Sequence, residues 1–303
     1  MQLFEREALL QNHFFSTSPY RFASTVIFLS AFTMLSLANA WGQKGGDNKA
    51  SLTLNSQGFI LSAFFGLDNA LPFRAHIICL GGAGKDGMPV VLSHIINPDA
   101  LKPEQFQIIT RNGDVHVPKC VTARPASDPG ETRTALLIGE FGDAPENPPE
   151  IVRIIGNLVA QENPLVSFQN AEVKVTPINA GPSLVWGEPV SKDDWGVKGI
   201  GTSCPKNGIR QIIRVTWDGG VRLPNGDDLG DEERQLYRVK VRRPDGSIDI
   251  VVPVALADLE DNDNNHFLCL DTADPAVTVS FPGGYLVDPN RDLNPDTQIQ
   301  ISR

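Results

Sequence analysis

The sequence lacks the short motifs that carry the common catalytic chemistries. It contains no C-x-x-C, which argues against a zinc ribbon or a thioredoxin-type redox site. Neither G-x-S-x-G nor H-E-x-x-H occurs, so the nucleophile elbow of serine hydrolases and the zincin helix are missing as well. These absences favour a protein without catalytic machinery. The plentiful carboxylates leave one enzymatic alternative open, a glycosidase-type pair of acids.

An excess of basic charge is also lacking. The chain has 26 Lys and Arg against 36 Asp and Glu, and its net charge is −10. Nucleic acids and anionic membranes bind basic surfaces, so we expect neither as a partner. After residue 40, no segment is apolar enough to cross a membrane, which needs about 20 residues.

The N-terminal segment has the pattern of an export signal. An apolar run over residues 26–37 leads to Ala38-Asn39-Ala40, which places small residues where a signal peptidase requires them. The run is short for a membrane span, although an uncleaved anchor is the alternative. We therefore expect a signal peptide at residues 1–40, a flexible lead-in at 41–57, and export to the periplasm or the extracellular space.

One pattern then occurs twice, beginning near residues 101 and 236. Each copy has an aromatic residue at the head of an alternating segment, then a turn glycine, then a proline that ends a second strand. These landmarks are Phe106, Gly113 and Pro118 in the first copy and Tyr237, Gly246 and Pro253 in the second. Alternation with period two between turn residues is typical of β-strands. The pattern predicts an all-β protein with an internal repeat.

The strands expected in each copy follow the same order. In the first copy we expect strands at residues 76–80, 89–96, 106–111, 134–138, 151–155 and 172–176. In the second copy, residues 211–217, 276–281 and 298–301 are their counterparts, with 211–217 matched to 76–81. The expected domains are 58–178 and 204–303. Residues 179–203, rich in glycine and proline without a period, are expected to be a linker.

Residues 90–115, VVLSHIINPDALKPEQFQIITRNGDV, resemble the bacterial immunoglobulin-like (Big or cadherin-like) domains of exported surface proteins. The shared features are an apolar strand, a proline and acidic turn, a leucine, and an aromatic that leads a short strand into a glycine turn. The resemblance implies two tandem immunoglobulin-like β-sandwich domains used for spacing, adhesion or binding. Fold analogy alone assigns no chemistry.

Four cysteines follow the expected signal: Cys79, Cys120, Cys204 and Cys269. An even count in an exported chain suggests two disulfides, for which three connectivities are possible. We favour Cys79–Cys120 and Cys204–Cys269, because each bond would then close within one copy of the repeat.

The glycine-rich segment 82–87 matches G-x-G-x-x-G, the fingerprint of dinucleotide sites. Such a site needs a helix to begin there, so that its N-terminus faces the pyrophosphate. The residues that follow, Met88 to Leu92, are typical of a strand instead. We therefore interpret the segment as a connection between strands and expect no nucleotide cofactor.

Two acidic loops are candidates for calcium binding. Oxygen-bearing side chains stand at alternate positions in the loop around residue 288, as at the start of a calcium loop. The glycine and glutamate that complete such a loop are replaced by Leu293 and Ile299. The second loop, residues 258–265, resembles the Asn-Asp-Asn linker of cadherins, but the repeat places it in the hairpin that matches 126–132. The candidate ligands are Asp288, Asn290, Asp292, Asp296, Asp258, Asp261 and Asp263.

The sequence thus predicts an exported, non-catalytic structural or binding module. Its expected partner is a protein or a carbohydrate of the cell envelope. Trp186 and Trp195 could stack on a sugar, although burial at a domain junction is favoured. The alternatives are a secreted hydrolase acting on polysaccharide through carboxylates, and a calcium-dependent adhesion module.

Overall fold

The computed structural model describes residues 56–302, which belong to one compact unit. The expected signal peptide and nearly all of the lead-in lie outside the described residues. Within 56–302, no helix is long and apolar enough to span a membrane.

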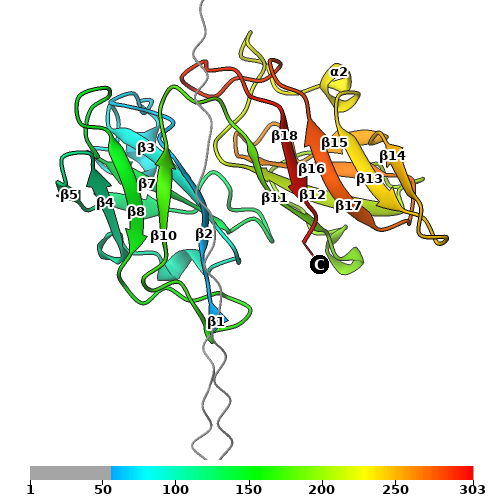
Figure 1. The fold of residues 1–303 in the computed structure, drawn as a ribbon, viewed down its shortest axis with the longest axis horizontal. Helices are drawn as coiled ribbons and strands as arrows, with labels where there is room; N and C mark the ends of the chain where they lie inside the picture. The colour runs from blue at the N-terminus through cyan, green and yellow to red at the C-terminus, as the bar shows by residue number, and fades with distance from the viewer. Residues whose placement is uncertain (1–55, 303) are drawn as a thin grey trace, which may run out of the picture. The chain divides into compact units, whose positions relative to one another are not determined.

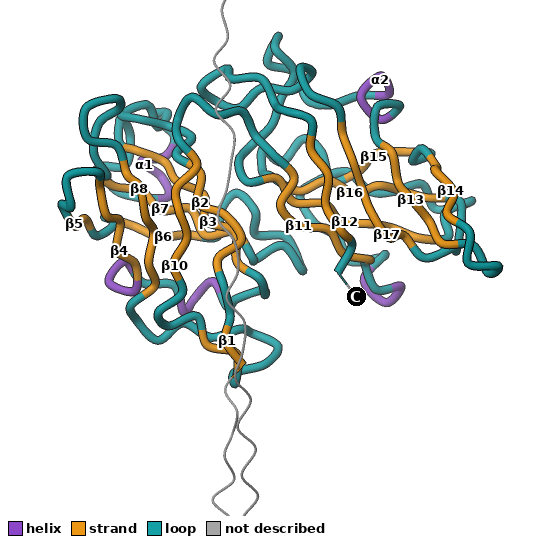
Figure 2. Tube along the Cα trace, in the orientation of Figure 1, coloured by secondary structure: helices purple, strands orange, loops and turns teal. Residues whose placement is uncertain are grey.

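The regular secondary structure of the described chain is almost entirely β-strand, as expected from its alternating pattern, and long loops connect the strands (Figures 1 and 2). Its helices are α1 (Ala75–Ile78) and α2 (Asp231–Arg234), with 3-10 turns at Pro98–Ala100, Pro103–Gln105 and Lys192–Asp194. We call residues 56–178 the N-terminal half and residues 179–302 the C-terminal half.

The N-terminal half contains ten strands. They are β1 (Ser56–Gln57), β2 (Ile60–Phe64), β3 (Asp86–Leu92), β4 (Phe106–Thr110), β5 (Val115–His116), β6 (Cys120–Thr122), β7 (Thr134–Gly139), β8 (Pro149–Ile154), β9 (Val166–Ser167) and β10 (Glu172–Thr176). Eight of them form one sheet in the order β5-β4-β8-β10-β2-β3-β7-β6, in which β10 and β2 pair in parallel. Side chains from both parts of this sheet, such as Ile108 and Val90, share one buried core, so the two parts face each other.

The C-terminal half contains eight strands in two sheets. They are β11 (Leu184–Pro189), β12 (Gln211–Trp217), β13 (Arg238–Arg242), β14 (Ile248–Val251), β15 (Ala255–Ala257), β16 (Asn265–Leu270), β17 (Ala276–Phe281) and β18 (Thr297–Gln300). The sheets have the orders β11-β12-β16-β15 and β14-β13-β17-β18. Alternate residues of both, including Trp217 and Phe281, form the core between them. The two sheets therefore pack face to face.

The two halves repeat one strand order. The segment β5-β4-β8-β10 corresponds to β14-β13-β17-β18, and β2-β3-β7-β6 corresponds to β11-β12-β16-β15. The aromatic landmarks Phe106 and Tyr237 are both fully buried. Their turn glycines, Gly113 and Gly246, both have positive φ, which favours glycine over any residue with a side chain. The structure thus has the internal repeat that the sequence pattern predicts.

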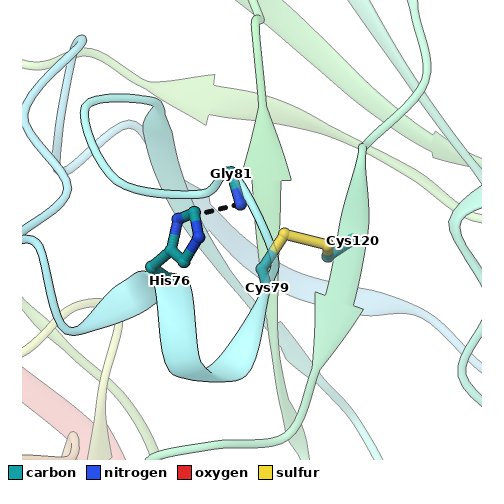
Figure 3. The surroundings of a disulfide bond; sticks show 4 residues. All are labelled: His76, Cys79, Gly81 and Cys120. Atoms are coloured by element: carbon teal, nitrogen blue, oxygen red, sulfur yellow. Dashed lines mark hydrogen bonds between the residues drawn. A yellow bond between two sulfur atoms is a disulfide. The ribbon is translucent and has the colours of Figure 1, made fainter.

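Two disulfides join the pairs favoured from the sequence. Cys79 bonds to Cys120, and Cys204 bonds to Cys269. Figure 3 shows the first bond between the end of α1 and strand β6, beside a hydrogen bond from the Gly81 amide to His76 Nδ1. The two bonds fit an oxidising compartment, because disulfides are rare in reducing ones.

The expected strand at residues 76–80 is wrong. Residues 75–78 form α1, on which His76, Ile77 and Ile78 are exposed while Ala75 and the disulfide-bonded Cys79 are buried. A short apolar run does not distinguish a strand from a helical turn by its period. The counterpart of β12 is consequently β3, rather than residues 76–81.

The segment 179–203, expected to be a linker, contains a strand. Residues Leu184–Pro189 form β11, which pairs with β12 as an edge of the first C-terminal sheet. A register shift between Leu184 and Trp186 interrupts the ladder, which explains why the sequence there shows no regular alternation.

Candidate metal centre

Equivalent hairpin loops of the two halves meet at an acidic centre. The loop between β6 and β7 contributes Asp128 and Glu131, and the loop between β15 and β16 contributes Asp258. These loops are counterparts in the repeat. Residues 199–203, which lead from β11 towards β12, cover the centre: Thr202 exchanges backbone hydrogen bonds with Asp258 and Leu259.

The three carboxyl groups converge. One oxygen from each of Asp128, Glu131 and Asp258 lies within 4.8 Å of the other two, and all three residues are buried. They line a cavity of about 40 Å³, with Arg214 on its wall. Such a space holds a single small ion or a water molecule.

When all three acids are ionised, two carboxylate oxygens in this cluster have no hydrogen-bond donor among the described residues. They are Glu131 Oε2 and Asp258 Oδ2, on side chains that are 1% and 4% exposed. Asp128 differs, because its Oδ2 accepts hydrogen bonds from the amides of Ile200 and Gly201. A buried carboxylate oxygen without a partner costs free energy, so its presence points to a ligand or a proton at this position.

The buried positive charge beside the cluster does not balance it. Arg214 Nε lies 3.9 Å from Glu131 Oε1, but the same guanidinium donates to the carbonyls of Gly130 and Pro129 and pairs with Glu188. Glu188 also pairs with Arg133 at 2.8 Å. One guanidinium, shared with Glu188, therefore stands beside the three carboxylates of the centre. When all of these groups are ionised, negative charge is left over, which a bound cation would compensate.

Burial changes the protonation of the cluster when no cation is bound. Burial, followed by the hydrogen bond to Asp258, raises the pKa of Glu131 far above its usual value. Burial also raises the pKa of Asp258. The pair therefore holds a proton at neutral pH, and a cation that binds between them must displace it.

Two further acids of the same loop lie close by. Burial raises the pKa of Asp261 to about 6, and burial and the nearby Asp261 charge raise the pKa of Asp263. Gly201 passes between Asp258 and Asp261: a Cβ there would lie 2.6 Å from Asp261 Oδ2 and 2.7 Å from Asp258 Oδ1. Only glycine lets the covering segment approach these carboxylates so closely.

The backbone of the acidic loop has an unusual conformation. Asp258, Glu260 and Asn262 all have positive φ, between 61° and 73°. Each non-glycine residue in this region costs free energy, of the order of 1 kcal/mol or more. Of the three, Asp258 is buried at the centre, whereas Glu260 and Asn262 are exposed.

The donor set fits a hard cation. Only carboxylate oxygens converge at the centre, without imidazole or thiolate, and calcium prefers oxygen ligands while zinc and copper favour nitrogen and sulfur. A glycosidase pair has a different geometry, with carboxyl groups about 5 Å or more apart around a sugar. Glu131 and Asp258 are instead in hydrogen-bond contact, in a cavity too small for a sugar ring.

In the other predicted calcium loop, most side chains form hydrogen bonds within the protein, although Asp288 Oδ2 has no partner among the described residues. Asp288 Oδ1 accepts from the Asp292 amide, Asn290 Nδ2 donates to Asp292 Oδ2, and Asp296 Oδ1 accepts from the Gly283 amide. Among the described residues, the three aspartates of this loop do not bring ligand atoms within 4.8 Å of one another as a group of three. Calcium at this loop stays a prediction.

Trp186 and Trp195, the two tryptophans considered for sugar stacking, have different surroundings. Trp186, on β11, is half-buried beneath the Arg133 guanidinium, which lies 4.5 Å from the ring centroid. Trp195 donates from its indole nitrogen to the Val190 carbonyl. Trp186 thus packs where the two halves meet, as favoured from the sequence, while Trp195 packs on its own segment.

Sequence reasoning missed Asp128 and Glu131. They stand as single acids in ASDPGET, where nothing marks them as ligands. The available signal was the repeat itself, because residues 126–132 match the acidic loop 258–265. Comparison with known proteins gives no further guide. No protein-family model matches the chain, and no curated protein is similar to it.

Proposed function

We propose that this chain is an exported, non-catalytic structural or binding module of the cell envelope, whose two halves are joined through a calcium ion. In this proposal the halves are tandem immunoglobulin-like β-sandwiches of the periplasm or the cell surface. Its partner is then a protein or a carbohydrate of the envelope. The observation that carries the calcium-dependent role is the pair of buried, unpartnered oxygens on Glu131 and Asp258 beside Asp128.

Several features support this role. The ligands come from both halves, so a bound cation would cross-link segments far apart in the chain. The two disulfides suit an exported protein, and millimolar calcium outside the cell suits a site of modest affinity. The repeated strand order supports two related domains.

The test is a calcium titration of the disulfide-bonded protein after chelator treatment. At calcium concentrations about a hundredfold above the dissociation constant, binding stabilises by about 2.7 kcal/mol, a rise in Tm of roughly 5–10 °C for a chain of this size. Isothermal titration calorimetry should show one site per chain. Repeating it in buffers of different ionisation enthalpy should show release of a proton, because calcium displaces the one held by Glu131 and Asp258.

The substitution Glu131→Gln tests calcium binding without disrupting the fold. The amide keeps the shape of the side chain and the hydrogen bond to Asp258, but removes a ligand charge. We expect the calcium-dependent rise in Tm to disappear, while the Tm without calcium equals or exceeds that of the unsubstituted protein. Glu146→Gln, at an exposed loop position, is the matched control and should keep the full response. A Tm insensitive to calcium and magnesium, with no binding heat, would refute the proposal.

A further inference from the structure

A second, larger cavity lies beside the metal centre and is apolar. It has a volume of about 490 Å³, within the range of small-molecule sites. Its walls include Leu71, Ala75 and Ile78 around α1 and Leu136 and Ile138 on β7, all from the N-terminal half. Water in such an enclosure contacts mostly carbon, so filling it with an apolar group is favourable.

This cavity opens into an acidic one. The neighbouring cavity, of about 470 Å³, shares Pro72, Arg74, Gly220 and Asp261 with the first, so the two are continuous. Its walls carry five carboxylates, Asp228, Asp258, Asp261, Asp263 and Asp288. The combined space is therefore apolar at one end and acidic at the other.

One carboxylate in the acidic cavity has an oxygen without a partner. Asp288 is 3% exposed; its Oδ1 accepts from the Asp292 amide, while its Oδ2 has no hydrogen-bond partner among the described residues. Asp261 Oδ2 is likewise buried and unpartnered. Both residues line the cavity, and a cationic N–H donor placed beside Asp288 would satisfy its free oxygen.

The positive groups around this cavity do not neutralise it. Arg222 donates to Asn262 Oδ1 and the Gly226 carbonyl, rather than to a carboxylate. His266 is buried and hydrogen-bonds Tyr237, and burial lowers its pKa to about 4, so it is neutral. Arg74 stands at the boundary between the two cavities. Two guanidinium groups thus face five carboxylates, a net negative charge that complements a cation.

The spacing of these carboxylates excludes a compact metal site. In residues 56–302, only Asp128, Glu131 and Asp258 bring three ligand atoms within 4.8 Å of one another. The acids around Asp288 are more widely spread. A spread set of acceptors suits an organic cation, whose N–H donors point in several directions, better than a metal ion, which needs ligands at about 2.0–2.6 Å.

We propose that the joined cavities bind a small organic cation with an apolar body, of the alkylammonium or alkylguanidinium class. The apolar body lies below α1, against Leu71, Ile78 and Leu136. The cationic head lies at the acidic end, where Asp288 and Asp261 accept its hydrogen bonds. This site adjoins the calcium centre, because Asp258 lines both, but its proposed acceptors, Asp288 and Asp261, are not among the three calcium ligands, and the inference does not depend on calcium binding.

Three probes with one chain length test the charge preference: n-octylammonium, n-octanol and n-octanoate. Calorimetric titrations with the disulfide-bonded protein are run in excess calcium and again after chelation. We expect octylammonium to bind at least tenfold more tightly than octanol, and octanoate to bind more weakly than octanol. Equal affinity for the three probes, tighter binding of octanoate, or no binding of octylammonium would each overturn the inference.

Two substitutions locate the site. A Cβ at Gly220 meets no atom closer than 4.0 Å, so Gly220→Trp can fill the junction of the cavities without a backbone clash. We expect it to abolish binding of octylammonium and octanol. Asp288→Asn should weaken octylammonium at least fivefold and leave octanol unchanged. Gly196→Trp, in open space outside both cavities, is the steric control and should bind normally.

The variant Glu131→Gln distinguishes octylammonium binding from calcium binding. Glu131→Gln removes a calcium ligand without touching either cavity wall, so octylammonium should bind this variant as it binds the unsubstituted protein. If Glu131→Gln abolishes octylammonium binding, the ammonium group occupies the metal centre instead, and the inference is wrong.

Discussion

The two halves of the molecule have the same strand order but join their strands differently. In the N-terminal half, β10 and β2 pair in parallel, so eight strands form one continuous sheet. Their counterparts in the C-terminal half, β18 and β11, belong to separate sheets and do not form a ladder. Single hydrogen bonds join the two segments, from the Ser302 amide to the Gly187 carbonyl and from the Leu184 amide to Thr297 Oγ1. The repeat therefore fixes the order of the strands and leaves the closure of the sheet free to vary.

The loops between equivalent strands differ more than the strands do. The β6–β7 loop contributes two isolated acids to the centre, whereas the β15–β16 loop carries four acids and three left-handed residues over Asp258 to Asp263. The strands must satisfy the core, which constrains alternation and turns in both copies alike. The loops are free of that constraint, so the features that could bind a ligand are concentrated where the copies differ.

The largest effect that we expect is a dependence of stability on pH, caused by buried acids in both halves. Burial raises the pKa of Asp218 to about 7 and of Asp261 and Asp288 to about 6 in the C-terminal half, and of Asp86 to about 6 in the N-terminal half. A raised carboxyl pKa means that the folded state holds a proton which the unfolded state has lost. Stability is then highest below the unfolded aspartate pKa of 3.8, and it falls as pH rises from there through the folded values of about 6 to 7.

We therefore expect the Tm of the calcium-free protein to fall by roughly 10 °C or more between pH 4.5 and pH 8, since each pKa unit is worth about 1.4 kcal/mol. Calcium should reduce the fall by replacing the proton held at Glu131. Differential scanning calorimetry across this range, with and without calcium, measures both effects. A Tm that rises with pH in the absence of calcium would contradict the burial of these acids.

The two disulfides begin at equivalent places but end at different ones. Cys79 and Cys204 precede the equivalent strands β3 and β12, whereas their partners lie on the non-equivalent strands β6 and β16. The loops they close span 41 and 65 residues. Because loop-closure entropy grows only with the logarithm of length, replacing either pair by serine should cost about 4 kcal/mol. Urea unfolding of the Cys79→Ser/Cys120→Ser and Cys204→Ser/Cys269→Ser variants measures the two costs. A difference above about 2 kcal/mol would show that native strain or packing, rather than loop closure, determines them.

Much of this fold could be predicted from local pattern. Residues 106–110 and 172–176 alternate cleanly and form β4 and β10, because one face of each strand is buried and the other is solvated. The failure at α1 has a different origin. There the run AHII leads directly into Cys79, whose disulfide ties the end of the short helix to β6, while Ile77 and Ile78 are exposed. A tertiary constraint of that kind leaves no periodic signal in four residues.

The candidate site was only half predictable, for a physical reason. Asp258, Asp261 and Asp263 stand out because acids cluster in one short loop. Asp128 and Glu131 lie about 130 residues earlier in the chain and meet Asp258 only in the folded structure, so this contact depends on how the halves pack. The sequence shows which acids are close along the chain, whereas cation binding requires oxygens that are close in space. The repeat was the one sequence feature that connects the two loops.

The smallest expected effect comes from exchanging the aromatic anchors of the two halves. Tyr237 is buried, and its hydroxyl hydrogen-bonds His266 Nδ1 at 3.1 Å; the equivalent Phe106 lies in a core without such a partner. Tyr237→Phe should cost about 1–2 kcal/mol, because it leaves a buried imidazole nitrogen unpaired. Phe106→Tyr should cost a similar amount, because it buries a hydroxyl among apolar side chains. Urea unfolding of both variants measures these costs, and if both are neutral, the two cores are interchangeable and the hydrogen bond to His266 does not distinguish them.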